Sequence, residues 1–199
     1  MSVEFPQHVV KLKNIPRSGW ISHGISLGDV ESVADHSFSV ATLAMQLASS
    51  LARQGTRVDI SKTLRIALIH DLSESLTFDI SKQYLDYLGP TGKRLKSKLE
   101  NKAMNKILTL IKDKAFADEC EAGYLEYVKA VTVESRLVHA ADGLDILIQI
   151  IDYESKGYPK RLLEPLWRET SRRLRGLEMR AVNRMVIALA RVRRRVSVA

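Results

Sequence analysis

Cysteine, glycine and proline are scarce in this chain of 199 residues, and each shortage excludes a class of protein. The single cysteine, Cys120, excludes an intramolecular disulfide and is typical of a protein from a reducing cytosol. Ten glycines and five prolines are too few for a loop-rich or all-β chain. No apolar run approaches the roughly 18 residues of a membrane-spanning helix, and no basic segment precedes an apolar one at the start. We therefore expect a cytoplasmic protein with no membrane span and no secretory signal.

The residues that are present indicate an ordinary globular protein. Hydrophobic residues make up 45% of the chain and charged residues 27%, and both values lie in the range of soluble domains. The length suits one hydrophobic core and gives no reason to propose two. The sequence therefore predicts a single domain over residues 1–199.

Positive charge is concentrated near the end of the chain. Residues 1–159 contain 19 Lys and Arg against 20 Asp and Glu, whereas residues 160–199 contain 12 against 3. This segment is either a tail that attracts nucleic acid or one solvated face of a helix. Since it contains one aromatic residue, Trp167, and no zinc-finger pattern, binding of nucleic acid is the minor hypothesis.

Apolar residues recur at steps of three and four over long stretches, which predicts an all-α fold. The clearest stretch begins after Ser32, a suitable N-cap with Asp35 three residues on, and ends near Gly55. No convincing strand alternation or internal repeat interrupts the pattern. The predicted helices cover residues 32–53, 61–74 (with Ser61 as the cap), 93–112, 118–127, 133–154 and 163–194.

Several groups that bind metals or protons lie on or beside these apolar stripes. His36 lies on the stripe of its helix, and the run before His70 and Asp71 is apolar, with Glu74 one turn further on. In the helix over 133–154, Asp145 belongs to the predicted inward face, as do Val138, Ala141, Leu144, Ile148 and Ile151. Asp142 lies beside that face.

Taken singly, each of these residues has an ordinary explanation, as a hydrogen-bonded core histidine or a surface aspartate. Together they would place two imidazoles and two carboxylates from three helices near one point. Such a set suits a divalent transition metal or Mg²⁺, with two positions left for water or a substrate oxygen. A bound cation would also compensate charges that are otherwise costly next to a core.

Four segments of the sequence resemble the successive motifs of HD-domain metal-dependent phosphohydrolases. The match is most similar to the subgroup of 5′-deoxynucleotidases and of the HD domain-containing protein 2 type. It extends over about residues 10–154 and does not include the Arg-rich segment over 160–199. The four segments are IPRSGW (15–20), ESVADHSFSVA (31–41), HDLSE (70–74) and ESRLVHAADGLDILIQIIDYE (134–154).

The resemblance implies a helical bundle of the HD-domain type, commonly a homodimer, and a role for each matching residue. His36, His70, Asp71 and Asp142 match the metal ligands of the family. Glu74 matches its catalytic carboxylate, and Asp79 a further active-site aspartate. Arg17 and Trp20 match residues associated with the phosphate and the sugar of the substrate.

Three residues depart from the family pattern. Phe78 stands where a glycine usually precedes the aspartate at 79, which affects the turn there. His139 stands where a lysine is usual and could be an extra ligand, an outer neighbour of the site or a residue on the helix surface. Gly123 or Tyr124 stands where a tryptophan is usual, so the nucleotide preference can differ from that of better-known members.

The expected function is hydrolysis of nucleoside 5′-monophosphates, with deoxyribonucleotides as the expected substrates. One divalent ion (Co²⁺, Mn²⁺, Mg²⁺ or Zn²⁺) would bind the attacking water and a phosphate oxygen. Glu74 would orient or deprotonate that water, and either Glu74 or Asp79 would protonate the leaving oxygen. Arg17 would hold the phosphate, and Trp20 would form a flat wall for the sugar or base.

Other functions remain open at this stage. An HD-type site can also act on a nucleoside triphosphate or an alarmone, whereas five histidines argue against a dinuclear site of the cyclic-nucleotide kind. A protein of another class would bind nucleotides or nucleic acid without catalysis. A purely structural bundle would leave Asp71 and Asp142 as unexplained charges near a core.

Overall fold

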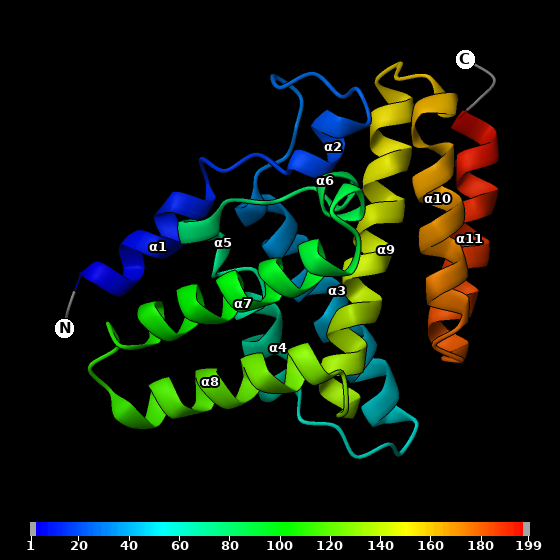
Figure 1. Ribbon diagram of the computed structural model, residues 1–199. Helices are drawn as coiled ribbons and strands as arrows, with labels where there is room; N and C mark the ends of the chain where they lie inside the picture. The colour runs from blue at the N-terminus through cyan, green and yellow to red at the C-terminus, as the bar shows by residue number, and fades with distance from the viewer. Residues whose placement is uncertain (1–2, 197–199) are drawn as a thin grey trace.

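The computed structural model describes residues 3–196, and the regular structure in this range is helical (Figure 1). No strand occurs within it, so the predicted all-α fold is confirmed. The helices are α1 Glu4–Leu12, α2 Ser18–Ser22, α3 Val33–Arg53, α4 Ile60–Ile69, α5 Glu74–Thr77, α6 Lys82–Tyr87, α7 Gly89–Leu108, α8 Lys114–Lys129, α9 Val133–Ser155, α10 Lys160–Arg175 and α11 Arg180–Val196.

Local sequence signals place the two longest helices correctly. The Ser32 hydroxyl accepts a hydrogen bond from the backbone N–H of Asp35, and the Asp35 carboxylate accepts one from the N–H of Ser32. This capping box begins α3 as expected. Thr132 and Ser135 form the same arrangement at the start of α9.

Several predicted boundaries are wrong. The helices predicted over 93–112 and 118–127 are α7 Gly89–Leu108 and α8 Lys114–Lys129. Helix α4 begins after Asp59, whose carboxylate accepts the N–H of Lys62, so Asp59 and not Ser61 is the cap. The helix predicted to reach residue 74 ends at Ile69. The helix predicted over 163–194 is divided into α10 and α11, because Gly176 follows α10 and Glu178 adopts a positive φ of 57°.

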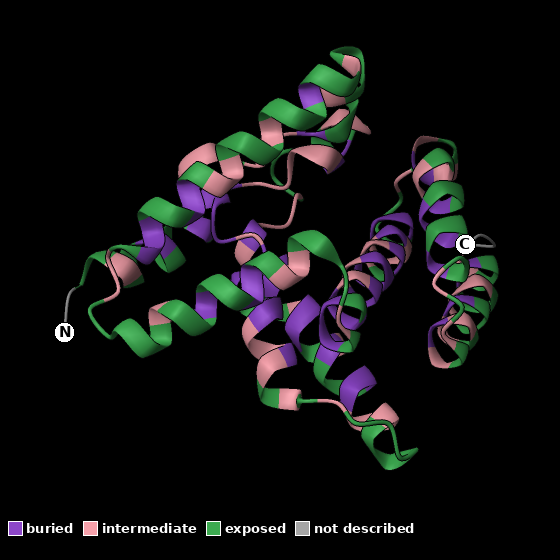
Figure 2. Cartoon of the chain, turned by 60° about the horizontal axis from the view of Figure 1, so that its bottom comes forward, coloured by how far each residue is buried: buried purple, intermediate pink, exposed green. Residues whose placement is uncertain are grey.

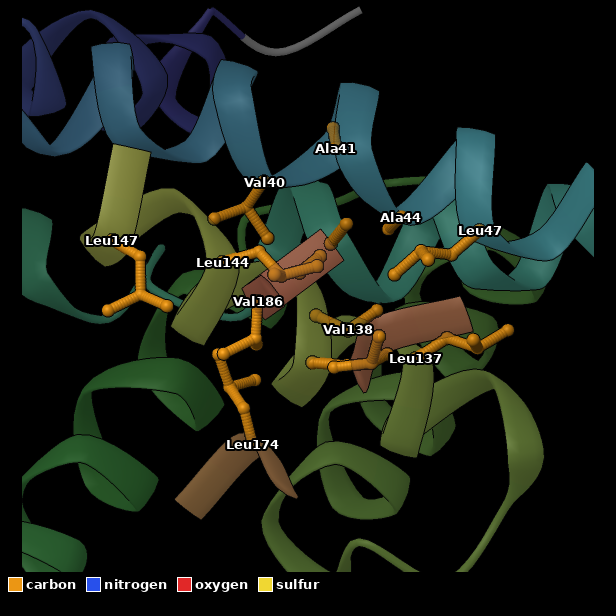
Figure 3. Close-up of a cluster of buried hydrophobic side chains, with 14 of the residues drawn as sticks. Val40, Ala41, Ala44, Leu47, Leu137, Val138, Leu144, Leu147, Leu174 and Val186 are labelled. Carbon is orange, nitrogen blue, oxygen red and sulfur yellow. The ribbon is translucent and has the colours of Figure 1, made fainter. Parts of the chain in front are cut away.

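Helix α9 lies at the centre of the larger hydrophobic core, in contact with α3, α4, α10 and α11. In Figure 3, Val40, Ala44 and Leu47 of α3 lie opposite Leu137, Val138 and Leu144 of α9, with Leu174 and Val186 nearby. Figure 2 shows the buried residues gathered between the helices.

The predicted inward face of α9 is wrong at one position. Ile148 is 37% exposed, and its neighbour Leu147 is fully buried. The buried face of α9 is broader than a single stripe because helices pack against it from several sides. Asp145 is buried as expected.

A second, smaller hydrophobic cluster joins α1, α4, α7 and α8. It contains Leu12, Ile69, Met104, Ile107 and Tyr124. The turn after α4 lies between the two clusters, because Ile66 and Ala67 belong to the larger cluster and Ile69 and Leu72 to the smaller one. His70 and Asp71 are therefore held between two packed regions.

Part of the positive charge near the end of the chain is internal. Arg193 of α11 is buried, and its guanidinium binds the Glu154 carboxylate of α9 at 2.6 Å and that of Glu164 at 2.8 Å. It also lies over the Trp167 ring, 4.4 Å from the centroid. This arginine attaches α11 to α9 and α10. Residues 197–199 of the predicted tail lie outside the described residues.

Within residues 3–196, no helix combines the length and the apolar character that crossing a membrane requires.

Candidate metal centre

His36 lies on the first turns of α3, fully buried against α9. Its Nδ1 donates a hydrogen bond to the Asp145 carboxylate of α9 at 2.7 Å. With its proton on Nδ1, the ring presents the lone pair of Nε2 on its other side. A carboxylate behind the ring is the usual partner of a metal-binding histidine, since it fixes the tautomer and the orientation.

His70 and Asp71 lie in a tight turn and not on the helix that was predicted to continue to Glu74. The N–H of Leu72 binds the carbonyl of Ile69, and the N–H of Glu74 binds that of Asp71, both across three residues. The Nδ1 of His70 donates to the Ala67 carbonyl at 2.7 Å, and this side chain competes with the backbone for the carbonyl. The turn leaves Nε2 of His70 facing Asp71.

The structure brings three of the four residues predicted as ligands, His36, His70 and Asp71, into one group, and places the fourth, Asp142, beside His36. Asp71 Oδ2 lies 3.2 Å from His70 Nε2 and 3.5 Å from His36 Nε2, and Asp142 Oδ1 lies 3.6 Å from His36 Nε2. Ligand atoms of His36, His70 and Asp71 all lie within 4.8 Å of one another. Such separations fit atoms that share one cation, for which metal–ligand distances are about 2.0–2.2 Å.

The donor set itself indicates a cation. Among the described residues, the buried Nε2 atoms of His36 and His70 have no hydrogen-bond partner. Buried polar atoms without a partner are rare and costly unless a ligand completes them. Two imidazole lone pairs beside the carboxylates of Asp71 and Asp142 therefore fit a divalent ion.

Charge interactions hold both carboxylates ionised. Burial works to raise the pKa of Asp71, but His70 and Arg17 outweigh burial and hold this pKa far below its ordinary value. Burial also opposes ionisation of Asp142, yet its pKa is lowered by Arg173, His36 and Arg17. An ionised carboxylate is the form that binds a cation.

A second group of possible ligand atoms comprises Glu31, His36 and Asp145. In this second group, each possible ligand atom already has a hydrogen-bond partner within the protein. Nδ1 of His36 is hydrogen-bonded to Asp145, and the indole N–H of Trp20 donates to Glu31 at 2.7 Å. This group therefore serves to orient His36 and Trp20.

Asp145 was expected on the inward face of its helix but was not identified as a partner of His36. We predict that Asp145→Asn lowers metal affinity by about 10–100-fold, as is typical when the outer partner of a ligand is changed. An amide fits the same space but accepts a hydrogen bond from Nδ1 less strongly. Isothermal titration with Mn²⁺ measures the effect, and equal affinity in both proteins would contradict the role of Asp145.

A cavity of about 630 Å³ opens onto the candidate ligands. Arg17 and Asp71 line it together, and Arg17 Nη1 donates to Asp71 Oδ2 at 3.3 Å. Trp20 also lines it, but only 3% of this residue is exposed and the ring packs edge-on against Tyr153. Trp20 is thus mainly a core residue at the cavity wall.

The two further predicted carboxylates line the same cavity. Glu74 is 3% exposed, and its Oε2 has no hydrogen-bond partner among the described residues. Burial, together with the charges of Asp71 and Asp79, raises the pKa of Glu74 well above its ordinary value. Asp79 instead accepts the backbone N–H of Ser18 at 2.6 Å, which ties it to the start of α2.

Phe78 takes a backbone conformation that favours glycine. Its φ is 60° and its ψ 165°, in a region almost restricted to glycine, and the residue is 68% exposed. The turn that carries Asp79 therefore contains backbone strain.

We therefore predict that Phe78→Gly increases the free energy of unfolding by about 1 kcal/mol. Relief of about 1–3 kcal/mol of strain outweighs the larger entropy that glycine loses on folding, of about 1 kcal/mol. Phe38→Gly is the control, because Phe38 is also exposed but lies inside α3, where glycine should destabilise. Urea unfolding compares the two, and destabilisation by both would refute the strain at Phe78.

The remaining departures from the family pattern lie behind the site. His139 donates a hydrogen bond from Nε2 to the Tyr127 carbonyl at 2.8 Å, and its ring stacks on the Tyr127 ring. The Tyr127 ring in turn makes a T-shaped contact with the His70 ring. His139 is therefore an outer neighbour, separated from His70 by Tyr127. Tyr124 is buried in the smaller hydrophobic cluster.

Several residues that line the cavity were not predicted from the sequence. Among them are Lys96 of α7, Tyr127 of α8 and Arg173 of α10. Arg173 Nη2 donates to Asp142 Oδ2 at 3.2 Å. A lysine or arginine on a Lys-rich or Arg-rich helix gives no local signal that distinguishes it from its neighbours.

Comparison with known proteins agrees with the all-α fold. A family model described as an HD domain matches residues 9–177, so the match includes α10 and extends beyond the predicted limit of 154. The 5′-deoxynucleotidase hdd1 of Schizosaccharomyces pombe is 31% identical over 157 residues, 77% of this chain and 73% of that protein. This chain belongs to the HD domain family and is an HD-domain phosphohydrolase.

This chain is also similar to a further curated protein and to solved structures. The 5′-deoxynucleotidase HDDC2 of Danio rerio is 31% identical over 163 residues, 81% of this chain and 74% of that protein. Among solved structures, a conserved hypothetical protein from Pyrococcus furiosus is 34% identical, with a TM-score of 0.72 over 97% of this chain and 99% of that one. The PH0347 protein from Pyrococcus horikoshii is 30% identical, with a TM-score of 0.71 over 96% and 98%.

Proposed function

We propose that this phosphohydrolase cleaves nucleoside 5′-monophosphates to nucleoside and phosphate, with deoxyribonucleotides as the expected substrates. The observation that carries the proposal is that the Nε2 atoms of His36 and His70 have no hydrogen-bond partner among the described residues and lie close to Asp71, which lines a cavity together with Arg17. The relatives named 5′-deoxynucleotidase support the choice of substrate.

His36, His70, Asp71 and Asp142 would hold one divalent ion, and Co²⁺, Mn²⁺, Mg²⁺ and Zn²⁺ are the candidates. When bound, such an ion lowers the pKa of water towards neutrality and neutralises charge that develops on phosphorus. Asp145 and the Ala67 carbonyl keep both imidazoles in the tautomer that presents Nε2. These two hydrogen bonds fix the positions from which His36 and His70 would bind the ion.

Glu74 is the group best suited to move a proton. Burial and the neighbouring Asp71 and Asp79 raise its pKa well above the ordinary value, and its Oε2 has no partner among the described residues, so this carboxyl group is free to exchange a proton with a bound molecule. It would take a proton from the attacking water or pass one to the leaving 5′-oxygen. Asp79 remains the other candidate for the leaving oxygen, although its bond to Ser18 occupies one carboxylate oxygen.

Arg17 would bind the phosphate through the N–H groups that Asp71 does not occupy. A guanidinium has five N–H donors and matches the oxygens of a phosphate. Trp20, largely buried and fixed by Glu31, would limit the space for the sugar.

A panel of 5′-monophosphates, assayed for phosphate release with each candidate ion and with a chelator, tests this proposal. Deoxyribonucleoside and ribonucleoside monophosphates are compared with nucleoside triphosphates and an alarmone. We expect release from monophosphates that stops on chelation and returns with the ion. Release that the chelator leaves unchanged, or release from triphosphates alone, would overturn the proposal.

Three further expectations stay predictions: a homodimer, one domain over the whole chain, and a minor affinity of the basic tail for nucleic acid.

A further inference from the structure

One face of α10 forms a wall of the cavity that holds the candidate metal centre. Its lining residues follow the helical period and lie on one side of the helix, which runs beside α9 in Figure 1. They are Pro165, Leu166, Glu169, Thr170 and Arg173. The resemblance found in the sequence ended before this helix, so it implied no substrate-binding role for any of these residues.

Arg173 reaches from this wall to a predicted metal ligand. Its Nη2 lies 3.2 Å from Asp142 Oδ2, while Oδ1 of the same carboxylate faces His36 at 3.6 Å. Asp142 thus lies between the centre and α10. About half of the Arg173 side chain, 48%, remains exposed, so the guanidinium is accessible from the cavity.

Gly143 makes this approach possible. A Cβ at this position would lie 2.8 Å from Leu174 Cδ2 and 3.1 Å from Arg173 Nη2, closer than such atoms normally come. The absence of a side chain next to Asp142 lets α10 pack closely against α9 at the level of the centre. The Arg173 guanidinium lies close to the place that a side chain at Gly143 would occupy.

Arg17 makes the same kind of contact with Asp71, the other predicted aspartate ligand. Arg17 Nη1 lies 3.3 Å from Asp71 Oδ2, just as Arg173 contacts Asp142, and both arginines line the cavity. Within residues 3–196 each guanidinium contacts a single carboxylate, so each keeps N–H donors for another acceptor. The cavity thus presents two arginines from helices far apart in the sequence.

The charge of the cavity gives its arginines a role. The carboxyl groups at the wall are those of Asp71, Glu74, Asp79, Asp86, Asp142 and Glu169, and the cationic groups are those of Arg17, Arg173, Lys82 and Lys96. Ionised carboxylates repel a phosphomonoester, which carries about −1.5 to −2 charges at pH 7. Cationic donors at the cavity wall therefore favour the entry of a phosphate.

We infer that Arg173 is a substrate-binding residue that holds the phosphate from the side opposite Arg17. This inference rests on the proposed hydrolysis of a phosphomonoester and extends it to α10. The N–H groups of Arg173 that do not bind Asp142 donate to phosphate oxygens, and the bond to Asp142 holds the guanidinium in place.

The test compares Arg173→Gln and Arg173→Lys with Arg172→Gln. Arg172 is the matched control, because it is the adjacent arginine on α10, is exposed and does not line the cavity. Three quantities are measured: the metal content, the affinity of the metal-loaded protein for inorganic phosphate by calorimetry, and kcat and KM for a 5′-monophosphate.

We expect Arg173→Gln to weaken phosphate binding and raise KM by about tenfold or more, as loss of a charged hydrogen bond does, with unchanged metal content. Arg173→Lys should recover part of the affinity, and Arg172→Gln should match the wild type.

Two results would overturn the inference. One is phosphate affinity and KM in Arg173→Gln equal to those of Arg172→Gln. The other is loss of metal with normal phosphate affinity once the ion is restored, which would mean that Arg173 only positions Asp142. If the wild type cleaves no monophosphate while Arg173→Gln still weakens phosphate binding, the proposed function fails and the role of Arg173 stands.

Discussion

Asp71→Asn is expected to abolish phosphate release and to lower metal affinity by more than about 100-fold, beyond the 10–100-fold effect of outer partners. Asp71 Oδ2 is the atom closest to both imidazole Nε2 atoms, at 3.2 and 3.5 Å, and it also accepts from Arg17. A neutral amide of equal size removes the charge that draws a cation to these groups. No other carboxylate within residues 3–196 contacts both imidazole Nε2 atoms and Arg17.

Thermal unfolding gives a measure of this loss that does not depend on catalysis. A ligand at 100 times its dissociation constant stabilises a protein by about 2.7 kcal/mol, so Mn²⁺ should raise the melting temperature of the wild type. Asp71→Asn should show no such shift, whereas Asp118→Asn, an exposed aspartate paired with Lys114, should behave as the wild type. A normal Mn²⁺ shift in Asp71→Asn would contradict the assignment.

Glu74→Gln is expected to lower kcat by about 10²–10⁴-fold, the usual contribution of a general acid or base. The amide keeps the shape of the side chain but cannot exchange a proton. Because Glu74 is not among the grouped ligand atoms, the variant should retain its metal and a KM close to that of the wild type.

Stopped assays of phosphate release and metal analysis on the same preparation separate the two effects. Glu121→Gln, on the exposed surface of α8, is the control for a generic loss of charge. A Glu74→Gln protein with normal kcat would assign the proton transfer to Asp79. A protein that lost its metal would make Glu74 a ligand instead.

The helices could be predicted where the signals are local. The capping box of Ser32 and Asp35 and the apolar period that follows lie within one helix, and α3 begins and ends where they indicate. The end of α4 could not be predicted in this way. The helical pattern in the sequence continues into residues 70–74. The turn that replaces it depends on the hydrogen bond from His70 Nδ1 to the Ala67 carbonyl and on packing between the two hydrophobic clusters.

The contacts around the site were partly visible from the sequence. His36, His70, Asp71 and Asp142 drew attention because charged or metal-binding groups beside apolar stripes need compensation. The resemblance to the HD-domain family then implied that these four are the metal ligands. Their outer partners depend on helix packing and have no local signature. Asp145 is 109 residues from His36, and Arg173 is 31 residues from Asp142.

Anomalous diffraction from crystals grown with Mn²⁺ would test the central claim most directly. The account predicts a single strong peak coordinated by His36 Nε2, His70 Nε2, Asp71 and Asp142. A peak on the opposite side of His36, between Glu31 and Asp145, or no peak at either group at saturating Mn²⁺, would contradict it.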